Sequence, residues 1–153
     1  MEERTRSILD EMARCDHAFN SLYRDAARAF GLSEAAMWVL YSVDASDGPV
    51  SQRELAGTMG ISKQTVNSAV ASLETKGLVE LHPVPGTRNR KDIVLTGSGA
   101  VLASRTVRHL REAEMRAVEM LGEDKARLFV DLHVEFVSAL RQELLKEGIR
   151  HGE

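Results

Sequence analysis

The sequence predicts a mainly α-helical fold with one small β-hairpin, in which a compact central module lies between long amphipathic helices. Three observations support this prediction. Apolar residues recur every three or four positions over residues 5–30 and again over residues 98–147, which is the period of a helix with one buried face. Two short helical patterns meet at a glycine near the middle of the chain. Two short apolar runs then flank a segment rich in Pro, Gly and Arg, which is typical of a hairpin.

The N-terminal helix is predicted over residues 5–30. Its apolar residues are spaced alternately by four and three positions, as in a coiled-coil seam, and Gly31 ends it. Ser33 is placed to cap a second helix, and the Gly48-Pro49 pair marks the loop that follows. The seam of the first helix consists of Ile8, Met12, Cys15, Phe19, Leu22, Ala26 and Ala29.

The stretch from Ser51 to Gly77 predicts two short helices joined by a tight turn. Ser51 and Glu54 fit a capping box that opens the first helix, and Gly60 interrupts it after about two turns. Ser62 caps the second helix, which stops at Gly77. The buried face of this second helix is predicted to hold Val66, Val70 and Leu73, and its outer face Gln64, Asn67, Ser68 and Ala71.

Strands are predicted at 78–82 and 92–96, with a basic hairpin tip between them. From Gly97 one long helix is expected to continue to Gly122, followed by a last helix. The apolar stripes of these long helices have too few partners within one such module. A symmetric dimer is the economical way to bury them.

Length and composition bound the class of protein. A chain of 153 residues suits one domain, so residues 1–153 are expected to form a single domain with its central module at 33–96 and dimerisation helices at 5–30 and 98–147. The charged N-terminus and the lack of any apolar run near the ~20 residues of a membrane span predict a cytoplasmic protein without membrane contact. The net charge is −3, but residues 51–96 carry six basic and four acidic side chains, so the local charge is positive.

Two short helices joined by a glycine turn and followed by a basic hairpin form a winged helix-turn-helix pattern, which predicts binding to double-stranded DNA. Gln64 and Asn67 suit adenine edges in the major groove, and Lys63 suits a guanine or a phosphate. Arg88 and Arg90 suit the minor groove. The full set of predicted DNA contacts is Gln52, Ser62, Lys63, Gln64, Thr65, Asn67, Ser68, Thr87, Arg88, Asn89, Arg90 and Lys91.

Four segments of the chain resemble the MarR family of transcriptional regulators: residues 51–56 (SQRELA), 61–66 (ISKQTV), 73–79 (LETKGLV) and 95–96 (LT). The flanking long helices match that family as well, so the resemblance covers nearly the whole chain. It implies a homodimer held by the N- and C-terminal helices, with the helix at 62–76 in a major groove and the hairpin at 82–92 beside the minor groove. It also implies repression from near-palindromic operators, relieved by a small-molecule effector or by thiol oxidation.

The sequence departs from the family pattern in two places. Many members carry an arginine where Ser68 stands and a further charged residue near Ser72. Their wing usually holds an Asp-Arg-Arg cluster, whereas residues 87–91 (TRNRK) are expected to lack the acidic partner. The helix at 62–76, which is the recognition helix of this family, therefore carries fewer charges, and this predicts a shallower salt dependence of DNA binding.

DNA binding is expected to be controlled either by a small-molecule effector or by oxidation of a thiol, and the two possibilities involve different residues. The family's ligand pocket suggests His17, Met37, Trp38 and Tyr41, although ordinary core packing is the favoured explanation for any single one of them. Cys15 is the candidate redox residue, but its place on the apolar seam favours a small buried side chain that fills the core.

Other functions receive little support from the sequence. A winged helix that serves as a protein-interaction adaptor is the alternative from another class, because the net charge is negative and the recognition helix carries few charges. The five histidines show no metal-ligand spacing, and no nucleophile elbow, phosphate loop or dinucleotide fingerprint is present. We therefore expect no enzymatic activity, no metal and no cofactor.

Overall fold

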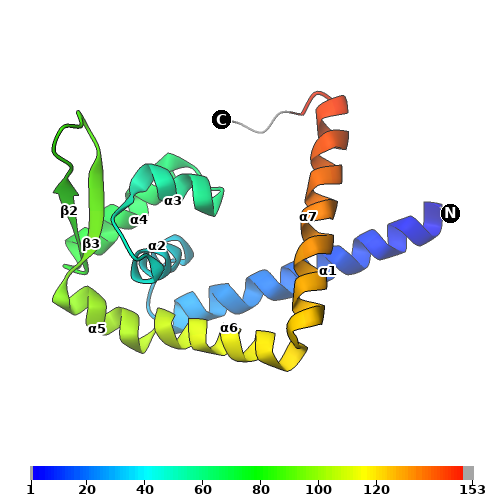
Figure 1. Ribbon diagram of the computed structural model, residues 1–153, viewed down its shortest axis with the longest axis horizontal. Helices are drawn as coiled ribbons and strands as arrows, with labels where there is room; N and C mark the ends of the chain where they lie inside the picture. The colour runs from blue at the N-terminus through cyan, green and yellow to red at the C-terminus, as the bar shows by residue number, and fades with distance from the viewer. Residues whose placement is uncertain (1, 150–153) are drawn as a thin grey trace. The chain divides into compact units, whose positions relative to one another are not determined.

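The computed structural model describes residues 2–149, which form two compact units (Figure 1). The larger unit ends at Leu110 and the smaller one begins at Arg111, within helix α6. No helix among residues 2–149 is long and apolar enough to cross a membrane. In chain order the elements are α1 (Glu2–Ala29), α2 (Glu34–Ala45), β1 (Val50–Ser51), α3 (Gln52–Met59), α4 (Lys63–Thr75), β2 (Val79–Pro83), β3 (Lys91–Leu95), α5 (Gly97–Arg105), α6 (Val107–Leu121) and α7 (Glu123–Lys146).

The predicted fold class is confirmed. The structure is mostly helical, with a three-stranded antiparallel sheet in the order β1-β3-β2. The β2–β3 hairpin forms as predicted, with each strand displaced by one residue, and Leu81 pairs with Ile93 at its centre. Strand β1 was not predicted, because two residues carry no periodicity. It pairs Val50 with Ile93 on the other edge of β3.

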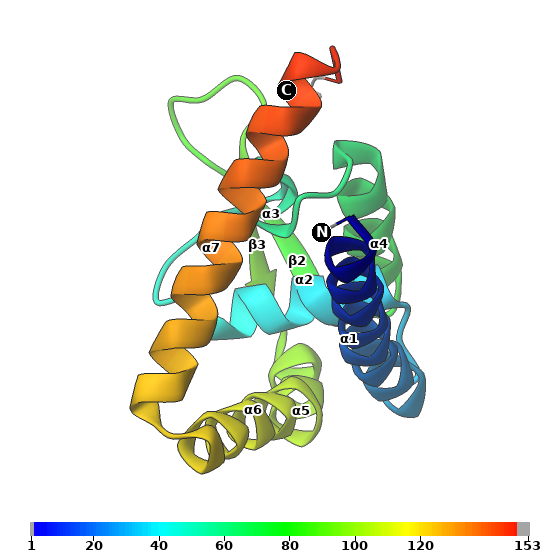
Figure 2. The same ribbon diagram turned by 90° about the vertical axis from the view of Figure 1, so that its right-hand side faces the viewer.

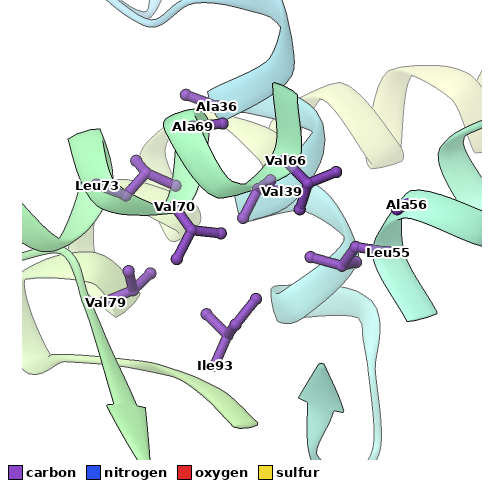
Figure 3. Packing of buried hydrophobic residues seen from close by; sticks show 10 residues of the cluster. All are labelled: Ala36, Val39, Leu55, Ala56, Val66, Ala69, Val70, Leu73, Val79 and Ile93. Atoms are coloured by element: carbon purple, nitrogen blue, oxygen red, sulfur yellow. The ribbon is translucent and has the colours of Figure 1, made fainter. Parts of the chain in front are cut away.

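A first hydrophobic cluster joins α2, α3 and α4 to the sheet (Figure 3). Val39 of α2 and Val70 and Leu73 of α4 are completely buried in it. Leu55 of α3 and Ile93 of β3 belong to the same cluster. The buried face predicted for the second short helix is therefore confirmed, and it fixes which side of α4 remains exposed.

A second cluster lies on another face of α2. Met37 and Leu40, both with 0% exposure, pack there against Ala27 of α1, Ala103 of α5 and Val107 at the start of α6. The buried residues of α2 that face the two clusters lie on adjacent faces of the helix, so α2 packs against both clusters at once. It connects the helix-turn-helix to the helices that flank it in the chain.

The predicted helix starts are confirmed by their hydrogen bonds. The Ser33 hydroxyl accepts from the amide of Ala36, and the Ser62 hydroxyl accepts from the amide of Thr65. Ser51 and Glu54 form the full capping box that opens α3. These caps satisfy backbone donors that the first turn of a helix leaves without partners.

The long helix expected from Gly97 to Gly122 is a wrong prediction, because the helix breaks at Thr106. Thr106 has φ −130° and ψ −88°, and its hydroxyl donates to the carbonyl of Leu102 at 2.6 Å. A threonine that bonds the preceding turn in this way bends or interrupts a helix. Beyond the break, Arg108 of α6 holds the almost fully buried carboxylate of Asp44 in α2 through three hydrogen bonds of 2.8–3.1 Å.

Helix α5 approaches the start of the hairpin at Gly99. A Cβ atom at this position would lie 1.9 Å from the carbonyl oxygen of Leu78, which is far inside van der Waals contact. The same junction is held by Thr96, whose hydroxyl donates to the carbonyl of Gly77 at 2.7 Å and accepts from the amide of Gly99 at 3.0 Å. The absence of a side chain at Gly99 therefore allows α5 to pack closely against the start of the hairpin.

We expect Gly99→Ala to lower the free energy of unfolding by roughly 3 kcal/mol, the upper part of the range for overpacking. The added methyl group forces α5 away from Leu78 and strains the Thr96 hydrogen bonds. Urea denaturation followed by circular dichroism measures the change. Gly97→Ala is the matched control, because a Cβ atom at Gly97 meets nothing within 4 Å. Equal stability of the two variants would contradict the close approach.

Candidate nucleic-acid interface

The outer face of α4 is a row of small polar side chains. Gln64, Asn67 and Ser68 are exposed and follow one another at helical spacing, opposite the buried Val66 and Val70. None of these three polar side chains bonds to another residue among those that the structure describes. Their donors and acceptors are therefore available to an external partner, as direct readout of base edges requires.

The N-terminus of α4 is preorganised by Ser62. Its hydroxyl accepts from the Thr65 amide at 3.1 Å and lies 2.8 Å from the Thr65 hydroxyl, so the two side chains bond each other. Lys63, in the first turn, is exposed. The positive end of the helix dipole and the Lys63 ammonium group together favour an anion here. Ser62 and Thr65 act first as a cap, which limits what they can offer to a phosphate.

The tip of the hairpin is shaped by a tight turn at Val84–Thr87. The amide of Thr87 donates to the carbonyl of Val84 at 3.2 Å, and Gly86 has φ +79°, as the third residue of a type II turn requires. The Thr87 hydroxyl also donates to Val84, at 2.8 Å, so this predicted DNA contact is used within the turn. Figures 1 and 2 show the hairpin loop at the end of the sheet opposite α5.

The two wing arginines differ in their surroundings. Arg90 lies 3.4 Å from a carboxylate oxygen of Glu54 in α3 and 3.3 Å from one of Asp92 in β3. Residues 87–91 contain no acidic residue, but the fold supplies Arg90 with two acidic partners from outside that segment, Glu54 and Asp92. Arg88, two residues nearer the tip, is exposed and forms no ion pair among residues 2–149.

Glu54 also takes part in the cap of α3. Its carboxylate accepts from the amide and the hydroxyl of Ser51 at 2.8 and 2.7 Å. The amide hydrogen bond, then the hydroxyl hydrogen bond, and then the charge of Arg90 hold the pKa of Glu54 below its usual value. The carboxylate is therefore charged at neutral pH.

A hollow of about 830 Å³ lies between α3, the first turns of α4 and the wing, and most of its lining residues are polar or charged. Half of the predicted DNA contacts line it: Gln52, Lys63, Asn67, Asn89, Arg90 and Lys91. The other six, Ser62, Gln64, Thr65, Ser68, Thr87 and Arg88, are exposed but lie outside its lining. Sequence reasoning missed five lining residues: Ser51, Arg53, Glu54, Gly57 and Thr58. The position of Arg53 beside Gln52 was a usable signal, whereas the role of Glu54 beyond capping depends on the fold.

The residues suggested for an effector pocket are only partly brought together. Trp38 and Tyr41 are half-buried, with ring centroids 5.4 Å apart, and Tyr23 of α1 lies 4.8 Å from Trp38. Met37 is completely buried in the second hydrophobic cluster, and His17 is exposed on α1. Phe19 adds a fourth ring 5.0 Å from Tyr23, so α1 and α2 share a row of aromatic side chains: Phe19, Tyr23, Trp38 and Tyr41.

Cys15 does not fill a core in the single chain. Its side chain is exposed on α1, as are its seam neighbours Ile8, Phe19 and Leu22. The prediction of a buried cysteine is therefore wrong for the described chain by itself, because most of the apolar seam of α1 is exposed among residues 2–149.

Comparisons with known proteins agree on one family. The MarR family matches residues 30–88, which span α2 to the wing. The repressor NicR of Pseudomonas putida is 34% identical over 86 residues, 54% of this chain and 54% of NicR, so the match spans about half the length of that relative.

Solved structures share the fold over most of the chain. MepR of Staphylococcus aureus, solved as a complex with DNA, is 24% identical with a TM-score of 0.67 and covers 88% of this chain and 96% of its own. NadR, solved with 4-hydroxyphenylacetate, is 21% identical with a TM-score of 0.68 and covers 84% of this chain and 91% of its own.

Proposed function

We propose that the chain is a member of the MarR family, whose pattern matches residues 30–88, and that it is a homodimeric repressor that binds a near-palindromic DNA operator in the cytoplasm. The observation that carries the proposal is the exposed polar face of α4 beside a basic wing, both bordering one hollow. Major-groove side chains and minor-groove cations are thereby presented together, as a winged helix requires. NicR is named a transcriptional repressor and MepR was solved with DNA, which supports this proposal. The proposal assigns no catalytic step and no cofactor to the chain.

The proposed contacts divide into two kinds. Gln64, Asn67 and Ser68 read base edges in the major groove, and basic side chains around them contact the phosphate backbone or the minor groove. Lys63, Lys91 and the newly recognised Arg53 lie at or near the hollow and suit phosphates. Arg88 suits the minor groove, because its guanidinium is exposed and forms no ion pair among residues 2–149.

We expect the protein to bind the DNA that flanks its own gene, and two sets of variants to weaken this binding differently. Gln64→Ala/Asn67→Ala should lose about 2–4 kcal/mol of discrimination between operator and random duplex, with the salt slope unchanged. Arg88→Gln should weaken binding to both the operator and the random duplex. It should also reduce the magnitude of the salt slope by about 0.9 for each phosphate that the variant no longer neutralises. Fluorescence anisotropy at several salt concentrations measures both effects. No binding at low salt would favour a protein-interaction adaptor.

The exposed apolar surface of α7 supports the dimer. No residue of this helix is buried among residues 2–149, although its stripe contains Phe129, Leu132, Phe136 and Leu140. Apolar residues of α1 and α6 are exposed as well, including Leu22. Stable monomers rarely expose so much apolar surface, and a second copy of the chain can cover it.

We expect the wild-type chain to be a dimer at micromolar concentration and Leu132→Glu/Phe136→Glu to shift it toward monomer. Two buried carboxylates without partners oppose association strongly. Sedimentation equilibrium measures the change. Ser138→Glu is the control, because Ser138 is exposed and lies about 200° around the helix from Phe136. A monomeric wild type, or a double variant that dimerises as tightly as the wild type, would contradict the proposed interface.

We further propose that a small aromatic effector binds at the row formed by Phe19, Tyr23, Trp38 and Tyr41. These rings belong to α1 and α2, and α2 also packs on α4 through the first cluster. A ligand that inserts between the rings therefore acts on the helix that supports the recognition helix. NadR, which shares the fold, was solved with the aromatic acid 4-hydroxyphenylacetate.

Trp38 is the single tryptophan, so intrinsic fluorescence reports directly on this row. We expect an aromatic acid of this class, with 4-hydroxyphenylacetate as the first probe, to change the Trp38 emission and to release DNA over the same concentration range. Tyr41→Ala should weaken both responses together, because it removes one ring of the row. Release of DNA without any change in Trp38 emission would place the effector elsewhere.

A further inference from the structure

Four polar residues form a closed ring at the corner where β1, α3 and β3 meet. Ser51 donates its amide and hydroxyl to one carboxylate oxygen of Glu54 at 2.8 and 2.7 Å. The other oxygen of Glu54 lies 3.4 Å from Nη2 of Arg90, and Nε of Arg90 lies 3.3 Å from a carboxylate oxygen of Asp92. Asp92 is paired with Ser51 across β1 and β3, which closes the ring.

The ring links the wing to the helix-turn-helix. Arg90 is located at the base of the wing, where its carbonyl accepts from the amide of Val84 at 3.0 Å and closes the hairpin loop. Glu54 belongs to α3 and is fixed by its own capping box. The ion pair therefore holds the base of a hairpin against a helix that is already rigid.

A phosphate at Arg90 would have to compete with two carboxylates for one guanidinium. Asp92 is well shielded, with 15% of its side chain exposed, and the Arg90 side chain is 44% exposed. Arg88 faces no such competition among residues 2–149. We propose that Arg90 is a positioning residue that fastens the wing to α3 through Glu54. Arg88 then supplies the arginine contact of the wing with DNA. This inference rests on the DNA-binding function proposed above.

The ion pair between Arg90 and Glu54 affects DNA binding by raising the fraction of molecules whose wing is already in the binding-competent conformation. A wing that is held in place before binding loses less conformational freedom on the operator, and the apparent affinity rises with the fraction of molecules in the competent arrangement. An exposed ion pair of this kind changes such an equilibrium by roughly two- to fivefold. The expected effects on affinity are therefore modest but measurable.

Glu54→Gln gives a test in which the two interpretations predict opposite signs. Glutamine can still accept from Ser51 in the capping box, and the substitution removes a negative charge from the proposed DNA-binding surface. If Arg90 simply contacts phosphate, the loss of this negative charge should tighten binding. If Arg90 fastens the wing, Glu54→Gln should weaken binding by roughly two- to fivefold.

Two further variants complete the comparison. Glu74→Gln removes the same charge from an exposed position of α4 whose side chain has no partner among residues 2–149, so it should tighten binding or leave it unchanged. Arg90→Gln should weaken binding with little change in salt slope, in contrast to Arg88→Gln. In the Arg90→Gln background, Glu54→Gln should have no further weakening effect, because the pair is already broken.

Hydrogen exchange in the free protein tests the fastening without DNA. The Val84 amide should exchange faster in Glu54→Gln and in Arg90→Gln than in the wild type, by a similar factor. The double variant should exchange no faster than either single variant. Thermal melts establish that each variant is folded. Unchanged exchange at Val84, or binding that Glu54→Gln tightens as Glu74→Gln does, would overturn the proposal. If the wild type fails to bind any duplex, the proposed function fails, while the exchange data still decide whether Arg90 fastens the wing.

Discussion

The burial of α2 on two of its faces is the constraint on which the rest of the structure depends. Ala36 and Val39 face the cluster formed with α3, α4 and the sheet, and Met37 and Leu40 face the cluster formed with α1, α5 and the start of α6. A helix enclosed in this way cannot shift without disturbing both sets of contacts, because protein interiors are close-packed. The position of α4 and the positions at which the flanking helices leave the module are therefore set by the same few side chains.

This arrangement explains how the proposed effector, bound on one side of α2, can affect the proposed DNA-binding surface on the other side. The row of four aromatic rings lies on α1 and α2, and the half-buried Trp38 follows directly after Met37 in the second cluster. A ligand that separates Tyr23 from Trp38 acts on a helix whose other face supports α4. An effector that binds more tightly to one position of α2 than to another is sufficient to change the affinity for DNA, and no other element has to move independently.

Local chemistry made much of this fold predictable from the sequence. The caps at Ser33, Ser51 and Ser62 depend on partners three residues away, so the sequence alone identifies them. The exposed face of α4 was predictable for the same reason, because the spacing of Val66 and Val70 determines which side is buried. These local signals were enough to predict the helix-turn-helix, the hairpin and most of the candidate DNA contacts.

Features that depend on distant residues were not predictable. The break at Thr106 accompanies the packing of Ala103 and Val107 against α2, and the approach of Gly99 to Leu78 exists only in the folded chain. The pairing of Arg90 with Glu54 joins residues of two elements that sequence patterns treat separately. The exposure of Cys15 follows from an apolar seam that the single chain does not cover. In each case the physical cause is tertiary contact, or the lack of it.

A hydroxyl-radical footprint of the protein on the DNA that flanks its own gene tests whether the protein is a dimeric winged-helix regulator. We expect two protected half-sites whose centres lie about 10 base pairs apart, because a symmetric dimer presents two copies of α4 to successive major grooves on one side of the duplex. Protection should extend into the flanking minor grooves, where the wings lie. A single protected half-site, or no protection at low salt, would contradict a dimeric winged-helix regulator.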